Sequence, residues 1–247
     1  MGLMASDVHQ LKIKLYCDGA NFDDIVSMAK NPSIRGFTTN PTLIRKAGIT
    51  DYEAFGRKIL AAVPNRPISL EVFADDLDHM ETQGRAIAEW GRNVNVKIPV
   101  TNTKREFTGP VIQRLARDGV VLNVTAIMTL DQVRRVAQVL DPNTPAIVSV
   151  FAGRIADTGV DPVPLMAEAV DILKERPKAE LLWASPRELL NVFQADSIGC
   201  QIITATTDIL GKLKLVGKDL DDYSLDTVKM FYNDAQAAGF SIREKVA

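Results

Sequence analysis

Short runs rich in apolar residues recur along the chain, and each is followed by a longer stretch typical of a helix. The short runs predict β-strands at residues 12–17, 34–39, 68–73, 93–100, 120–127, 146–152, 180–184 and 200–205. The longer stretches predict helices at residues 22–29, 51–63, 75–92, 104–117, 129–140, 162–174, 186–193 and 207–216, with one more at 225–238. Two helix starts carry specific signals, because Thr129 is placed as an N-cap and Pro186 as a first-turn proline.

Eight strand-then-helix units with no linker between them predict an α/β protein with a single (β/α)8 TIM barrel and an extra C-terminal helix. The domain would span residues 1–247, with an N-terminal extension at 1–11 and a C-terminal helix and tail at 224–247. A doubly wound open sheet is the structural alternative. That fold carries a glycine-rich phosphate loop after its first strand, and residues 18–21 (DGAN) do not form one, so the pattern favours the barrel.

One predicted strand contains a charged residue at its centre. In residues 93–100 four apolar residues alternate with Asn95, Lys97 and Pro99, so Lys97 lies at the centre of a β-like apolar run. If both faces of the sheet are covered, burial disfavours the charged ammonium, and the neutral amine can form a Schiff base with a carbonyl substrate. The alternative is a half-exposed strand with a solvated polar face, and this stretch taken alone favours that alternative.

Composition narrows the class of protein. The chain has 247 residues, a formal net charge of -2 and a pI near 5.8, which argue against a nucleic-acid or anionic-membrane surface. Two histidines are too few for a His-rich metal site or a Ser-His-Asp triad. The two cysteines lie in an apolar context, in which cysteines are more often reduced than paired. No apolar run reaches membrane-spanning length, and residues 1–14 lack a signal-peptide core. We therefore expect a cytoplasmic protein.

Polar residues collect at the predicted carboxyl ends of the strands, which share one pocket in a barrel. Each alone is an ordinary turn or cap residue, but a barrel core without a function would prefer branched apolar residues at these positions. The set consists of Asp18, Thr38, Asn40, Glu71, Lys97, Asn123, Thr125, Ser149, Ser185 and Thr204.

Two arginines follow the sixth and seventh strands, Arg154 in residues 151–154 (FAGR) and Arg187 in residues 185–187 (SPR). Loops in this part of a barrel commonly bind phosphate through backbone N–H groups and an arginine fork. The alternative is a pair of solvated surface arginines.

Together these residues resemble a known family, the transaldolases. The resemblance runs from residue 15 to about residue 240 and rests on five motifs, at residues 38–41 (TTNP), 70–72 (LEV), 96–99 (VKIP), 123–126 (NVTA) and 151–155 (FAGRI). The chain length is similar to that of the small-subunit branch, which also contains the fructose-6-phosphate aldolases.

The resemblance implies a cofactor-free mechanism in which Lys97 forms a Schiff base with a ketose phosphate, keeps a dihydroxyacetone unit and passes it to an aldose phosphate. Glu71 and Thr125 would hold a catalytic water, and Asp18 would be the acid/base at the hydroxyl that loses its proton on cleavage. The implied substrate-binding residues are Thr38, Asn40, Asn123, Ser149 and Phe151, with Arg154, Ser185 and Arg187 at the phosphate.

Glu71 and Phe151 resemble the transaldolase branch. The aldolase branch typically has glutamine at the first of these positions and tyrosine at the second. Three departures from the family pattern, Gly19, Trp183 and Pro186, leave the substrate open. The rival hypotheses are a lyase that releases free dihydroxyacetone and a sugar-phosphate-binding barrel without catalysis. The resemblance also implies a homo-oligomer and a place in carbohydrate metabolism such as the pentose phosphate pathway.

Overall fold

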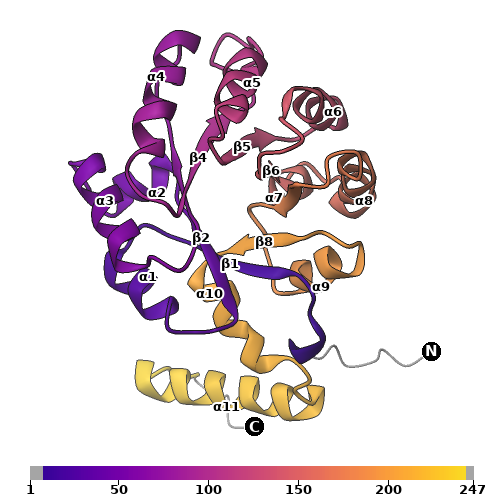
Figure 1. The fold of residues 1–247 in the computed structure, drawn as a ribbon. Helices are drawn as coiled ribbons and strands as arrows, with labels where there is room; N and C mark the ends of the chain where they lie inside the picture. Colours follow the sequence, from indigo (N-terminus) through magenta and orange to yellow (C-terminus); the bar gives the residue numbers. More distant parts are fainter. Residues whose placement is uncertain (1–7, 243–247) are drawn as a thin grey trace, which may run out of the picture. The chain divides into compact units, whose positions relative to one another are not determined.

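The protein, a computed structural model, is described over residues 8–242, which divide into two compact units, residues 11–212 and residues 8–10 with 213–242. The larger unit is a closed barrel of eight parallel strands, each paired with its neighbours in chain order, and helices surround the strands (Figure 1). This confirms the predicted TIM barrel. The strands are β1 (Lys14–Asp18), β2 (Ile34–Thr38), β3 (Ile68–Glu71), β4 (Val94–Pro99), β5 (Leu122–Ile127), β6 (Ala146–Val150), β7 (Ala179–Trp183) and β8 (Ile202–Ala205).

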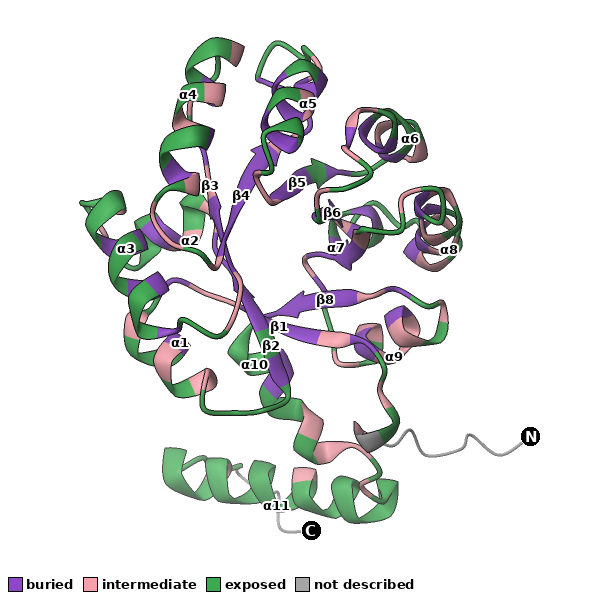
Figure 2. Cartoon of the chain, in the orientation of Figure 1, coloured by how far each residue is buried: buried purple, intermediate pink, exposed green. Residues whose placement is uncertain are grey.

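The strands are buried on both faces, whereas the outward surfaces of the helices are exposed (Figure 2). Five of the six residues of β4 are buried, and Lys97 is only 5% exposed. The half-exposed strand that the sequence pattern allowed is therefore wrong. A parallel sheet covered by helices removes water from both faces, so Lys97 has to find its partners within the protein.

The helices of the larger unit follow the predicted order, and most begin at a polar cap. Thr129 is the N-cap of its helix, as predicted, because its side chain accepts a hydrogen bond from Gln132 N in a reciprocal capping box. These helices are α1 (Phe22–Met28), α2 (Pro41–Lys46), α3 (Tyr52–Ala62), α4 (Leu77–Ala88), α5 (Gly109–Arg117), α6 (Leu130–Val139), α7 (Ala152–Ala156), α8 (Pro162–Leu173), α9 (Leu190–Ser197) and α10 (Thr207–Gly211).

Several local assignments differ from the prediction. Helices α2 and α7 are too short, at six and five residues, to show a helical period in the sequence. Helix α5 begins at Gly109 and not at residue 104, because Pro110 marks its first turn. The predicted helix start at Pro186 is wrong: Arg187 N donates to Asn191 Oδ1 at 2.8 Å in a loop, and α9 begins only at Leu190.

The smaller unit contains two 3₁₀ turns at its borders, η1 (Val8–Gln10) and η2 (Lys212–Leu215), and the long helix α11 (Leu220–Ala238). Helix α11 begins five residues before its predicted start, because Asp219 caps it by accepting hydrogen bonds from Asp221 N and Asp222 N. It ends at Gly239, whose φ of 67° lies in the left-handed region. Within the described residues, no helix is long and apolar enough to span a membrane.

Candidate active site

A hollow of about 590 Å³ lies at the carboxyl ends of the strands, where a TIM barrel presents its loops. The barrel brings together almost all of the predicted site residues here. The hollow is lined by Asp18, Thr38, Asn40, Glu71, Lys97, Thr125, Ser149, Phe151, Arg154, Ser185 and Arg187 among those predicted, and Thr204 from the wider set of strand ends also lines it.

A buried ion pair forms the centre of this hollow. Glu71 and Lys97 are register partners on β3 and β4, and Lys97 Nζ lies 3.0 Å from Glu71 Oε2. Lys97 Nζ also donates a hydrogen bond of 2.7 Å to the carbonyl oxygen of Thr39. An amine with a carboxylate at this distance can lose a proton to it and then act as a nucleophile in a site with little water.

Asp18 ends β1 beside a pair of hydroxyl groups. Thr38 Oγ1 donates to Asp18 Oδ1 at 2.7 Å and also lies 2.5 Å from Thr204 Oγ1. Desolvation by burial raises the pKa of Asp18, and it outweighs the hydrogen bond from Thr38 and the charge of Lys97, which lower it. A carboxyl whose ionised form is disfavoured takes up a proton readily, which suits an acid/base role.

Thr125 presents an unusual polar atom to the hollow. Its Oγ1 is buried and has no hydrogen-bond partner within the described part of the chain. The next residue, Ala126, has a φ of 63°, a left-handed conformation that costs a residue with a Cβ about 1–3 kcal/mol. Such strain collects where the backbone has to aim a side chain, and an unpartnered buried hydroxyl can accept a substrate or a water.

The two predicted amide ligands differ in their placement. Asn40 lines the hollow as the N-cap of α2, and its Oδ1 accepts a hydrogen bond from Leu43 N at 3.0 Å. Asn123 is fully buried and is not among the residues that line the hollow. Its amide accepts from Ser149 Oγ at 2.6 Å and donates to Ser69 Oγ at 3.0 Å, so it holds Ser149 in place.

Two cationic side chains border the hollow on the side of β6 and β7. The guanidinium of Arg154 lies 5.6 Å from the ring centroid of Phe151, and Arg187 pairs with Asp157 in a two-pronged ion pair with an Nε–Oδ1 distance of 2.9 Å. Ser185 has a φ of 61°, and its carbonyl oxygen comes so close to Gly153 that no side chain fits there. The arrangement brings two guanidinium groups to one edge of the hollow, where they suit an anion.

Several lining residues carry no signal in the sequence pattern. Lys46 adds a third cation from the end of α2, a helix too short to be predicted, and Thr42 lies near its start. Leu43, Met128, Leu182 and Ala184 add apolar wall. Thr204 was identifiable as a strand-end hydroxyl, but nothing in its sequence context distinguishes it as a site residue.

Trp183 does not face the hollow. Its neighbours Leu182 and Ala184 line the hollow, so the alternation of β7 turns Trp183 to the opposite face of the sheet, where it is fully buried. Its indole N–H has no partner within the described residues. The bulk of Trp183 therefore has no direct contact with a ligand in the hollow.

Comparisons with known proteins identify the family of the chain. Residues 15–242 match the family described as "Transaldolase/Fructose-6-phosphate aldolase". A protein of Dehalococcoides mccartyi named "Probable transaldolase" is 35% identical over 199 residues, covering 80% of this chain and 88% of that protein. One of the same name from Thermoanaerobacter sp. is 30% identical over 231 residues, covering 93% of this chain and 100% of that protein.

A solved structure supports the fold alone. The crystal structure of dihydrodipicolinate synthase from Rhodopseudomonas palustris superposes with a TM-score of 0.52 at 12% identity, covering 90% of this chain and 79% of that one. The family match extends over most of the chain, and the matches to relatives at 30–35% identity cover most of both proteins. The chain therefore belongs to the transaldolase/fructose-6-phosphate aldolase family and is an enzyme of this kind.

Proposed function

We propose that the enzyme is a transaldolase, which transfers a dihydroxyacetone unit from a ketose phosphate to an aldose phosphate through a Schiff base on Lys97. The observation that carries the proposal is the buried amine of Lys97, 3.0 Å from the carboxylate of Glu71 in a hollow that opens at the strand ends. Related proteins of this family are named "Probable transaldolase", which supports the same reaction.

The chemistry begins when the amine of Lys97 attacks the ketone carbon and water leaves, which forms an iminium ion. Asp18 accepts the proton of the hydroxyl on the carbon that becomes the aldehyde, and the adjacent C–C bond breaks. The bonding electrons flow into the iminium, so an enamine of dihydroxyacetone stays on Lys97 while the aldose phosphate leaves. The enamine then attacks the carbonyl carbon of the acceptor, and water releases the new ketose.

The polar groups around Lys97 divide between the two ends of the sugar. Glu71 and the unpartnered hydroxyl of Thr125 would hold the water that moves protons on and off the imine. Asn40 would bind the dihydroxyacetone hydroxyls with support from Thr38 and from Ser149, which Asn123 holds in place, and Phe151 would form apolar wall. Arg154, Ser185 and Arg187 would bind the phosphate.

A borohydride trap tests the proposal. The protein is incubated with fructose 6-phosphate and borohydride, and the modified residue is mapped by mass spectrometry, with Lys97→Met as the control. We expect an adduct of dihydroxyacetone size on Lys97 that is absent from the variant. If no ketose phosphate in a panel leaves an adduct on Lys97 after borohydride treatment, the Schiff-base mechanism is refuted.

A lyase that releases free dihydroxyacetone is the second candidate, because the family includes fructose-6-phosphate aldolase. Glu71 and Phe151 favour the transferase, because they resemble the residues of the transaldolase branch and not the glutamine and tyrosine typical of the aldolase branch. Turnover of fructose 6-phosphate that depends on added erythrose 4-phosphate supports transfer, and release of dihydroxyacetone without an acceptor supports the lyase.

The setting of the enzyme is also a proposal. We expect a homo-oligomer in the cytoplasm that acts in the pentose phosphate pathway without nucleic-acid or membrane partners. Helix α11 supports association, since none of its residues is buried and it exposes several large apolar side chains. Light scattering of the full chain tests this, and a monomer at micromolar concentration would contradict it. The exposed apolar residues of this helix are Leu220, Tyr223, Leu225, Val228, Met230, Phe231 and Tyr232.

A further inference from the structure

The hydrogen-bond ladder between β2 and β3 stops one rung before Glu71. Thr39 N donates to Ser69 O at 3.2 Å, and in a continued parallel ladder Glu71 N would donate to Thr39 O, while the N–H of residue 41 would donate to Glu71 O. Residue 41 is proline, which has no N–H, and the chain turns there into α2. Glu71 O therefore needs another partner, and so does Glu71 N, because the Thr39 carbonyl accepts its hydrogen bond from Lys97 Nζ.

The hydroxyl of Tyr52 takes the place of the missing rung. It accepts a hydrogen bond of 2.8 Å from Glu71 N and donates one of 3.1 Å to Glu71 O, so a single side-chain group satisfies both. Burial raises the pKa of Tyr52, so its hydroxyl keeps the proton that it donates.

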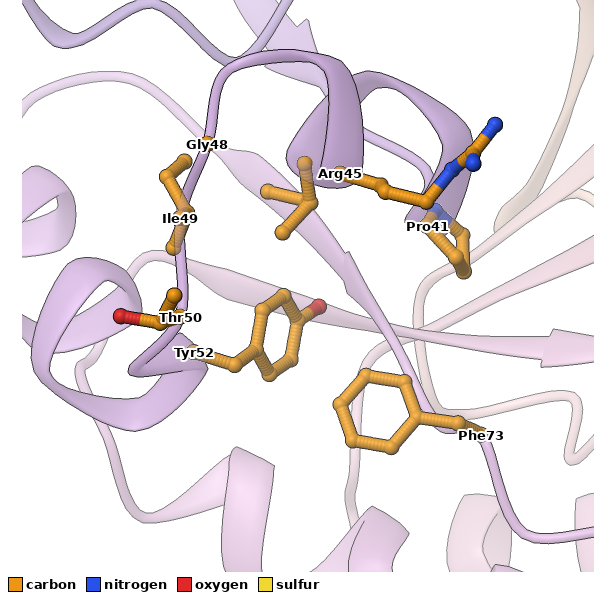
Figure 3. Close-up of a pocket in the computed structure, with 8 residues that line it drawn as sticks. Pro41, Arg45, Gly48, Ile49, Thr50, Tyr52 and Phe73 are labelled. Carbon is orange, nitrogen blue, oxygen red and sulfur yellow. The ribbon is translucent and has the colours of Figure 1, made fainter.

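The ring of Tyr52 is held in place from two sides. It packs edge-on against Phe73, with centroids 4.7 Å apart, and against Trp90 at 5.5 Å. The rings of Tyr52 and Phe73 line a second hollow of about 380 Å³ (Figure 3), which shares Pro41 with the hollow that contains Lys97. The side chain of Asp51 caps the helix that begins with Tyr52, accepting from Ala54 N at 2.9 Å, which fixes the main chain at the base of this side chain.

The replacement of this main-chain hydrogen bond by the Tyr52 hydroxyl affects the surroundings of the reactive amine. Because Tyr52 satisfies Glu71 N, the carbonyl of Thr39 remains available, and it accepts the hydrogen bond of 2.7 Å from Lys97 Nζ. The same hydroxyl anchors the main chain of Glu71, whose carboxylate lies 3.0 Å from that amine. One group thus controls both oxygen atoms that contact Lys97 Nζ.

We propose that Tyr52 is a positioning residue for the reaction at Lys97: its hydroxyl replaces a rung of the β2–β3 ladder, so that Glu71 and the Thr39 carbonyl hold the amine in its reacting position. The inference rests on the proposed Schiff-base function of Lys97. Tyr52 itself touches neither substrate nor amine and acts through Glu71 and Thr39.

The test is Tyr52→Phe, which removes the hydroxyl and keeps the ring. We expect Glu71 N to turn to the Thr39 carbonyl, so that Lys97 loses an acceptor and its position. The kcat for fructose 6-phosphate with erythrose 4-phosphate should fall about 10- to 100-fold, because small misplacements at a reacting centre have effects of this size. The KM should change less than about twofold, since the groups that bind the sugar are unchanged.

Phe73→Leu is the matched control, because it weakens the packing of the Tyr52 ring and keeps the hydroxyl. Its melting temperature should change little, because Phe73 is 57% exposed, and its kcat should stay within about twofold of the parent. A Tyr52→Phe variant with the parent kcat, or one whose loss is equalled by Phe73→Leu, overturns the inference.

Crystal structures of the parent and of Tyr52→Phe separate this inference from the proposed function. If the parent neither forms a Lys97 adduct nor turns over any ketose phosphate, the proposed function is wrong, and the positions of the atoms still decide the role of Tyr52. We expect Lys97 Nζ to leave the Thr39 carbonyl in the variant. An unchanged contact between them refutes the role of the hydroxyl.

Discussion

The strongest steric prediction concerns Gly153, at the point where α7 passes the loop after β7. A Cβ added at this residue would lie 1.5 Å from Ser185 O and 2.6 Å from Ser185 C, and both are main-chain atoms that cannot rotate away. In Gly153→Ala the loop or the helix has to retreat by roughly 2 Å to restore an ordinary van der Waals contact. The loop carries Ser185 and Arg187, so the proposed phosphate site moves while Lys97, on β4, stays in place.

The effect has two measurable parts. Overpacking of this kind costs about 1–3 kcal/mol of unfolding free energy, which urea denaturation measures. The KM for fructose 6-phosphate should rise at least about tenfold, because a displacement above 1 Å misaligns the groups that bind the phosphate. Borohydride trapping of dihydroxyacetone on Lys97 should stay within about twofold of the parent, since that ligand carries no phosphate.

Gly211→Ala is the matched control, because a Cβ at Gly211, at the end of α10, meets nothing within 4 Å. It should leave KM unchanged and stabilise the protein by up to about 1 kcal/mol through helix propensity. A folded Gly153→Ala variant with the parent KM for fructose 6-phosphate would refute the assignment of this loop to the phosphate. An equal loss of dihydroxyacetone trapping would refute the separation of the two ends of the site.

Three further predictions follow from single contacts. Lys97→Met leaves the carboxylate of Glu71 without its partner, so urea denaturation should show a loss of about 1–3 kcal/mol of unfolding free energy. The double variant with Glu71→Gln should recover part of this loss, and additive losses would contradict the pairing. Because desolvation raises the pKa of Asp18 above its value in the unfolded chain, its ionisation lowers stability as the pH rises through the raised pKa. Asp18→Asn should therefore gain unfolding free energy relative to the parent as the pH rises above the ordinary pKa of an aspartate, about 4, and a constant difference would contradict this sign. Trp183→Phe removes an indole N–H that has no partner within the described residues and lies on the outward face of β7, so kcat and KM should stay within about twofold of the parent. A changed KM would show that Trp183 affects substrate binding.

Local periodicity in the sequence determined the architecture and most of the site. Short apolar runs marked all eight strands, period-two alternation marked the one with Lys97, and polar residues at the strand ends marked the wall of the hollow. These signals arise within a few neighbouring residues, because the direction of a side chain on a strand depends on its parity, and the carboxyl ends of parallel strands share one edge.

The tertiary structure decided what the predicted residues contact. That Lys97 is buried depends on helices covering the sheet, and its bond to Thr39 O joins residues 58 positions apart. Asn123 proved to hold Ser149, although the resemblance implied a direct sugar ligand, and a role for Tyr52 had no signal in the sequence. The reason is physical: the partner of a main-chain group at a strand end depends on where the neighbouring strand leaves the sheet and which distant side chain fills the gap, and the period of a single segment does not contain that information.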